Sequence, residues 1–161
     1  MSINGTPLHP LVVHVAVVLI PLAALCGFAY AARDGWRWWL RWPMVVAAVV
    51  GAGSVGLAYV TGRQLYHQRF ALAQGPLRDA INTHRHWAHL LIVAAAAYVV
   101  VAALAAWALG GPSALVSGWG ARATVTAWRV PALVLLVLGA LVVLVLVVLT
   151  GDAGARAVWN P

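Results

Sequence analysis

The sequence contains no lysine, no glutamate and only three aspartates, so ammonium and carboxylate groups are almost absent. Charged residues make up 8% of the chain and hydrophobic residues 64%, which excludes an ordinary soluble domain. The single cysteine, Cys26, excludes an intrachain disulfide and a four-cysteine metal site. The N-terminus lacks the charged flank and cleavage site of a signal peptide, so we expect the first apolar run to be retained.

Four long apolar runs occupy residues 10–32, 42–62, 86–109 and 126–150. Each has about the 20 residues that a helix needs to cross a bilayer. We therefore predict an all-α membrane protein, a bundle of four transmembrane helices that forms one domain over residues 1–161. The polar connection, residues 63–85, is expected to contain an amphipathic helix at the membrane interface, with Asn82 or Thr83 capping the third helix.

All six histidines lie near the ends of these apolar runs, and these ends share one side of the membrane if the helices alternate in direction. His86 and His89 share one face of the third helix, since they are three residues apart. His14 lies at a depth similar to that of His89, so we expect the two to face each other, whereas His9 and His67 are expected to be solvated. The sixth histidine is His84.

Histidines in a helical bundle hold haem through two axial nitrogens or a divalent metal through three. They also relay protons, or they hydrogen-bond at helix ends without binding anything. Asp152 is expected to orient an imidazole as a neighbour of the site, or to pair with Arg156 or Arg63. The candidate cofactor is haem b, with a divalent metal or no cofactor as alternatives, and the candidate ligands are His9, His14, His84, His86 and His89.

The segment Gly51–Gly56 matches the dinucleotide-binding pattern GxGxxG, but it lies inside an apolar run with no strand before it. We interpret Ala48, Ala52 and Gly56, which recur every four residues, as a seam for close helix packing. The alternative function follows from this seam: a non-catalytic subunit or scaffold of a membrane complex, or a homo-oligomer. No nucleophile with a matching base is visible, so the sequence leaves open whether the chain is an enzyme.

The net charge of +7 comes from ten arginines dispersed over short connections. This dispersal is typical of contacts with a lipid bilayer, and no nucleic-acid partner is expected. Arg33, Arg37 and Arg41 follow the first helix, interleaved with tryptophans as in an interfacial belt facing lipid phosphates. Since basic residues favour the cytoplasm, we predict a multi-pass protein of the inner (plasma) membrane, with the histidines and both termini outside the cytoplasm.

Four motifs of this sequence occur together: His9-Pro10-Leu11-Val12-Val13-His14, Thr61-Gly62, a histidine near the start of the third helix, and Thr150-Gly151-Asp152-Ala153-Gly154-Ala155 with Val158-Trp159. In these motifs the chain resembles the DUF2231 family of bacterial four-helix membrane proteins, whose function is undetermined and whose members are similar in outline to small b-type cytochromes. The resemblance implies His9, His14 and either His84 or His86 as shared positions. Thr61-Gly62 and Thr150-Gly151 also indicate a duplicated helix pair.

Overall fold

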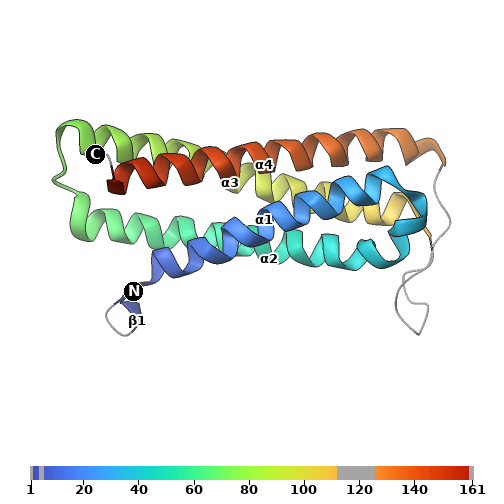
Figure 1. Ribbon diagram of the computed structural model, residues 1–161, viewed down its shortest axis with the longest axis horizontal. Helices are drawn as coiled ribbons and strands as arrows, with labels where there is room; N and C mark the ends of the chain where they lie inside the picture. The colour runs from blue at the N-terminus through green and yellow to red at the C-terminus, as the bar shows by residue number, and fades with distance from the viewer. Residues whose placement is uncertain (1, 4–5, 112–125, 160–161) are drawn as a thin grey trace.

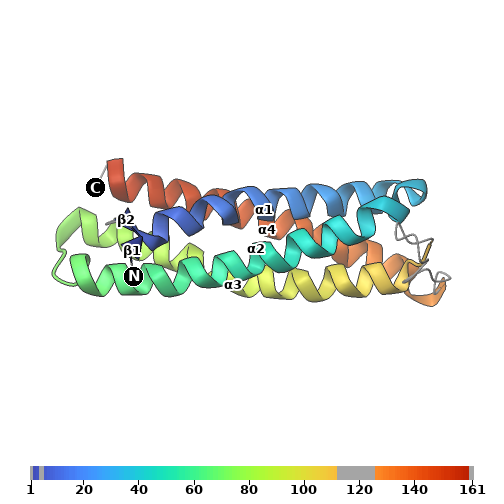
Figure 2. The ribbon, with the colours of Figure 1, turned by 90° about the horizontal axis from the view of Figure 1, so that it is seen from below.

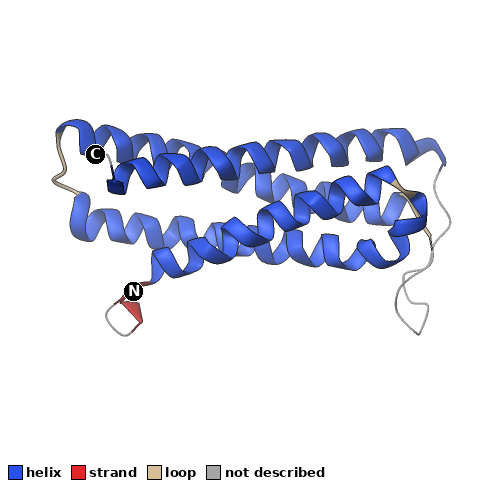
Figure 3. Cartoon of the chain, viewed as in Figure 1, coloured by secondary structure: helices blue, strands red, loops and turns tan. Residues whose placement is uncertain are grey.

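The computed structural model describes residues 2–3, 6–111 and 126–159, which are almost entirely helical (Figure 3). All four long helices of this part of the chain are apolar enough to cross a membrane, which confirms the predicted fold. They are α1 (Leu8–Ala32), α2 (Arg37–Leu65), α3 (Gly75–Ala108) and α4 (Arg129–Trp159). The shorter elements are β1 (Ser2–Ile3), β2 (Thr6–Pro7), two 3-10 turns, η1 (Asp34–Trp36) and η3 (Thr126–Trp128), and a π-helical turn, η2 (Tyr66–Phe70).

The four helices run up and down in chain order (Figures 1 and 2). Helices α1 and α3 each pack against both α2 and α4, so α1 lies diagonally across the bundle from α3. The start of α1, the turn from α2 into α3 and the end of α4 meet at one end of the bundle (Figure 1). We call it the histidine end, because all six histidines lie in the first half of α1, in η2 or in the first half of α3, which are nearest to this end. The opposite end, at η1 and the start of α2, is the arginine end.

The core contains many alanines, and its buried positions in α3 and α4 recur mostly every three or four residues, the spacing that lets helices pack side by side at a shallow angle. Many large apolar side chains lie outside: Val18 and Val148 are each 63% exposed. A surface of this kind is stable in lipid, where helix contacts depend on close approach rather than on hydrophobic burial. Representative core positions are Leu91, Ala95, Tyr98, Ala102 and Ala105 in α3, and Ala132, Leu136, Ala140, Val143 and Val147 in α4.

The small residues of α2 divide between the inside and the outside of the bundle. Ala48 is buried, and a Cβ on Gly51 would lie 3.0 Å from Cδ1 of Ile20 in α1. Gly56, by contrast, has open space where a Cβ would stand. Helices α1 and α2 therefore approach each other closely at Ala48 and Gly51. The predicted seam of Ala48, Ala52 and Gly56 does not lie entirely on the inward face of α2.

The helix boundaries differ from the prediction most in the polar connection. Helix α3 begins at Gly75, with Pro76 in its first turn, so the predicted cap at Asn82 or Thr83 is wrong. Thr83 lies in the helix interior, where its hydroxyl donates to the carbonyl of Asp79. Polar residues extend a helix into the headgroup layer as readily as apolar ones, so hydropathy marks the end of the membrane span rather than the end of the helix.

The arginine end also differs from the predicted belt. Arg37 and Arg41 are 4% and 2% exposed, so their guanidinium groups point into the bundle rather than toward lipid phosphates. Arg37 Nε donates to the carbonyl of Tyr30 over 3.2 Å, and Arg41 Nη2 donates to the carbonyl of Gly110 over 2.6 Å. Asp34 forms ion pairs with Arg37 and with Arg129, which joins the α1–α2 turn to the start of α4. The connection between α3 and α4, residues 110–125, is expected from its glycines and serines to be a plain loop, and it lies mostly outside the described residues.

Candidate functional site

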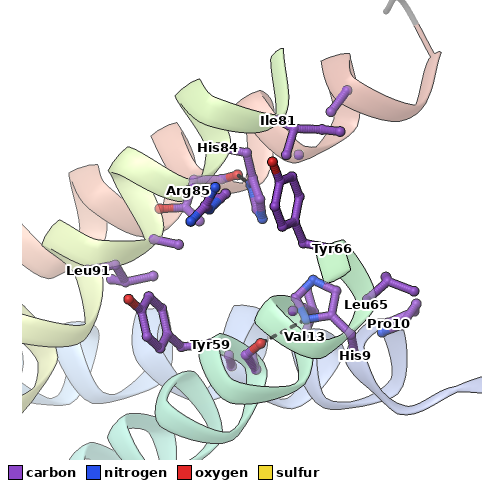
Figure 4. A pocket seen from close by; sticks show the side chains of 18 of the residues that line it. His9, Pro10, Val13, Tyr59, Leu65, Tyr66, Ile81, His84, Arg85 and Leu91 are labelled. Carbon is purple, nitrogen blue, oxygen red and sulfur yellow. Dashed lines mark hydrogen bonds between the residues drawn. The ribbon is translucent and has the colours of Figure 1, made fainter. Parts of the chain in front are cut away.

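A cavity of about 440 Å³ opens between the four helices at the histidine end (Figure 4). Most of its lining is apolar, with Val13 from α1, Val55 from α2, Leu91 from α3 and Val147 from α4. Its volume lies in the range of small-molecule sites, about 300–1,000 Å³, and such sites combine apolar walls with a few polar groups. The polar groups here include two imidazoles that enter from diagonal helices.

His9 lies in the first turn of α1 and crosses to α2. Its Nδ1 is 2.9 Å from the carbonyl oxygen of Ala58, and the ring is half-buried. Gly62 lies beneath the ring, and a Cβ on this glycine would be 3.0 Å from Cε1 of His9. The expectation that His9 is solvated without a partner is therefore wrong, because hydropathy cannot report a neighbour that leaves room for a ring.

His84 makes the equivalent contact in the other half of the bundle. It projects from α3 to α4, with its Nδ1 3.0 Å from the carbonyl oxygen of Thr150. Gly154 leaves room for the ring, because a Cβ there would lie 3.1 Å from both Cε1 and Nδ1 of His84. In each helix pair, α1–α2 and α3–α4, a histidine ring therefore contacts a backbone carbonyl of the neighbouring helix. The residue four positions after that carbonyl is a glycine, which leaves room for the ring.

The same arrangement occurs once more, in the middle of the bundle. Tyr98 of α3 donates its hydroxyl to the carbonyl of Ala23 over 3.0 Å, and Gly27 follows four residues later. A Cβ on Gly27 would overlap this hydroxyl. A helical carbonyl already accepts from the N–H four residues ahead, and a ring from a neighbouring helix has room to reach it as a second donor where the side chain at that position is missing.

The carbonyl bonds fix the tautomer of both imidazoles. A carbonyl oxygen can only accept, so Nδ1 carries the proton in His9 and in His84, and each Nε2 keeps its lone pair. The two rings face each other from opposite walls of the cavity, with centroids 6.4 Å apart and planes inclined by 79° (Figure 4). The carbonyl bonds thus leave the Nε2 atoms of two rings, one from α1 and one from α3, available at this cavity.

The other predicted histidines point elsewhere. His14 is exposed at the cavity wall, and its Nδ1 lies 2.6 Å from the carbonyl of Pro10 in its own helix. His86 is exposed beside Trp87, and His89 is exposed with its ring centroid 6.1 Å from that of Tyr59. The structure thus pairs α1 with α3 through His9 and His84, and not through His14 and His89.

Asp152 does not orient an imidazole in this structure. Its carboxylate pairs with Arg156 over 2.9 Å on the exposed face of α4, one of the alternatives that the sequence left open. Backbone carbonyls of Ala58 and Thr150 orient the rings instead. The sequence signal for these contacts was a small residue or threonine followed four positions later by glycine, a pattern too common in membrane helices to single out.

The two helix pairs share a similar histidine contact, in a register that differs from the one expected for a duplicated pair; the duplication itself stays a prediction. The sequence suggested that Thr61-Gly62 corresponds to Thr150-Gly151, whereas the histidine contacts match Ala58 and Gly62 with Thr150 and Gly154. Both threonines bond back to their own helices, Thr61 to the carbonyl of Leu57 and Thr150 to that of Leu146.

A family model described as a predicted membrane protein, DUF2231, matches residues 5–161 of this chain. The chain belongs to the DUF2231 family. This match confirms the resemblance drawn from the histidine and glycine motifs, and with the four apolar helices it makes this DUF2231 member a multi-pass membrane protein. No curated protein and no solved structure matches the chain.

Proposed function

We propose that this DUF2231 protein binds haem b in the cavity at its histidine end, with Nε2 of His9 and Nε2 of His84 as the two axial ligands. One observation carries the proposal: the two imidazoles face each other across the cavity, each with its Nδ1 bound to a backbone carbonyl. Metal-binding histidines usually donate their other ring nitrogen in this way, which fixes the ring and raises the basicity of the ligand.

The spacing of the rings supports this assignment. Metal–imidazole bonds of about 2 Å on either side of one ion place the two ring centroids about 6 Å apart when both Nε2 atoms point at it. The centroids of His9 and His84 are 6.4 Å apart. Gly62 and Gly154 support the same geometry, since a methyl group at either position would push its ring out of place.

The number of protein ligands favours haem over a bare divalent ion. Within the described residues there is no group of three or more His, Cys, Asp and Glu side chains that could hold a metal ion. Protein sites for zinc supply three or four ligands, whereas a haem brings four nitrogens of its own and needs at most two. The apolar walls of the cavity also suit a porphyrin better than a hydrated ion.

Haem held by two imidazoles supplies one-electron transfer. The chain's own contribution is to hold both rings at fixed orientation and to keep water from them with the apolar walls contributed by all four helices. His84 and His9 arise from different helix pairs, so the site also ties α1–α2 to α3–α4. We infer a role as a small redox protein or redox subunit of the membrane.

The test is the reduced-minus-oxidised optical spectrum of the protein purified from cells supplied with a haem precursor. We expect the sharp α band of a haem with two axial histidines, together with bound haem near one per chain. His9→Ala and His84→Ala should each remove it, whereas His86→Ala and His67→Ala, which change exposed histidines at the same end, should leave it unchanged. A featureless spectrum and no bound metal would refute the proposal and leave the scaffold alternative standing.

We further infer that the chain lies in the inner (plasma) membrane with the histidine end outside the cytoplasm. The support is the run of Arg33, Arg37 and Arg41 after the first helix, although the burial of two of them leaves Arg33 as the exposed member. Single cysteines at His67 and Trp38, introduced after Cys26→Ser, should label from opposite sides with an impermeant reagent. Labelling of Trp38→Cys from outside intact cells would reverse the orientation.

A further inference from the structure

Two arginines line the cavity beside its histidines. Arg63 follows Gly62, the glycine under His9, and Arg85 follows His84 directly. Arg85 lies beside His84 on the same wall, with its guanidinium carbon 4.6 Å from the ring centroid of Tyr66 (Figure 4). The aromatic face holds this charge in place without neutralising it.

The cavity has positive charge and no matching negative charge. Among the described residues that line it there is no aspartate or glutamate. Asp34 and Asp152 pair with arginines elsewhere, at the arginine end and on the exposed face of α4. Within the described part of the chain, no ion pair involves Arg63 or Arg85. A mostly apolar cavity that carries two uncompensated guanidinium groups is suited to an apolar ligand that bears anionic groups.

We propose that Arg63 and Arg85 form an anion subsite that binds the two propionate carboxylates of the porphyrin and so fixes its orientation. This inference rests on the proposed function, since it names the part of the ligand that these residues recognise. Guanidinium groups match carboxylates through paired hydrogen bonds, and both arginines, although exposed, line the cavity where such a carboxylate would lie. The histidines hold the centre of the ligand, and the arginines select its charged edge.

The test uses metal-free protoporphyrin IX, because its binding needs no axial ligand. Fluorescence titrations in detergent compare the free acid with its dimethyl ester, which has the same ring but no carboxylates. In the Arg63→Gln/Arg85→Gln variant the dissociation constant of the free acid should rise about tenfold or more, the effect of losing a charge-assisted hydrogen bond. Binding of the ester should not change.

The matched control is Arg69→Gln/Arg78→Gln, which removes two exposed arginines from the same end that do not line the cavity. It should leave the affinity for both ligands at the wild-type value. The inference is overturned if both double variants lose the same affinity for the free acid, or if Arg63→Gln/Arg85→Gln loses affinity for the acid and the ester alike. The two arginines would then contact lipid headgroups or support folding. No binding of the free acid to the wild type would also overturn it.

The failure of the proposed function is a separate outcome. His9→Ala/His84→Ala should lose haem but keep the preference of the wild type for the free acid over the ester. If this variant keeps an unchanged haem spectrum, the axial assignment fails while the arginine subsite stands. If the histidine variant loses haem, but Arg63→Gln/Arg85→Gln still binds the free acid as tightly as the wild type does, the arginine subsite is refuted and the axial assignment stands.

Discussion

Replacing Gly154 with alanine should destabilise the protein even though alanine is the better helix former. The new Cβ would lie 3.1 Å from Cε1 and Nδ1 of His84, closer than an ordinary van der Waals contact. The ring must then move away from the carbonyl of Thr150, to which it is bonded over 3.0 Å. Because both α3 and α4 are packed against their neighbours along their length, the ring moves more readily than the helices.

The competing contributions can be compared in size. Overpacking of a filled site costs about 1–3 kcal/mol, and loss of the hydrogen bond costs about 0.5–1.5 kcal/mol. Alanine in place of glycine in a helix gains up to about 1 kcal/mol. We therefore expect a net loss of about 0.5–4.5 kcal/mol in the free energy of unfolding, together with weaker haem binding.

The assay is reversible unfolding in mixed micelles, with Gly151→Ala as the control. Gly151 lies one turn earlier in α4, and a Cβ there would have nothing within 4 Å, so this variant should be unchanged or slightly more stable. In a His84→Ala background the cost of Gly154→Ala should disappear, since the clash partner is gone. Equal stability of Gly154→Ala and Gly151→Ala would refute the claim that glycine makes room for the ring.

Three further changes test other contacts of the bundle. Tyr98→Phe should lower the free energy of unfolding by about 1 kcal/mol, since it removes the buried bond to the carbonyl of Ala23 and leaves the ring in place; Tyr59→Phe, measured in the same micelles, is the control and should be neutral. Arg41→Ala should lower it by about 2–4 kcal/mol, as seen when one partner of a buried charged network is removed, and an unchanged denaturation midpoint would contradict the buried role of this guanidinium. Asp152→Asn should change stability by about 0.5 kcal/mol or less and leave the haem content unchanged, because its pair with Arg156 is exposed; loss of haem would restore Asp152 as a neighbour of the site.

The fold could be predicted from the sequence because the lipid requirement is local. A stretch of about 20 apolar residues without charge must form a helix, since each backbone group needs an internal partner. Four such runs determine four antiparallel helices, and this alternation alone places all six histidines at one end. The same hydropathy could not find the first eleven residues of α3, Gly75 to Arg85, because they are helical without being apolar.

The choice among the histidines depended on tertiary structure. Burial depth along the chain favoured His14, but depth does not say what a side chain contacts, and the exposed ring of His14 lies against a carbonyl of its own helix. His9 and His84 are turned inward because Gly62 and Gly154, on neighbouring helices, leave space for a ring beside an accessible carbonyl. Such a contact joins residues 49 and 66 positions apart, so it exists only once α1 is packed on α2 and α3 on α4. Sequence determined which end of the bundle carries the imidazoles, and packing between helices decided which two of them face each other.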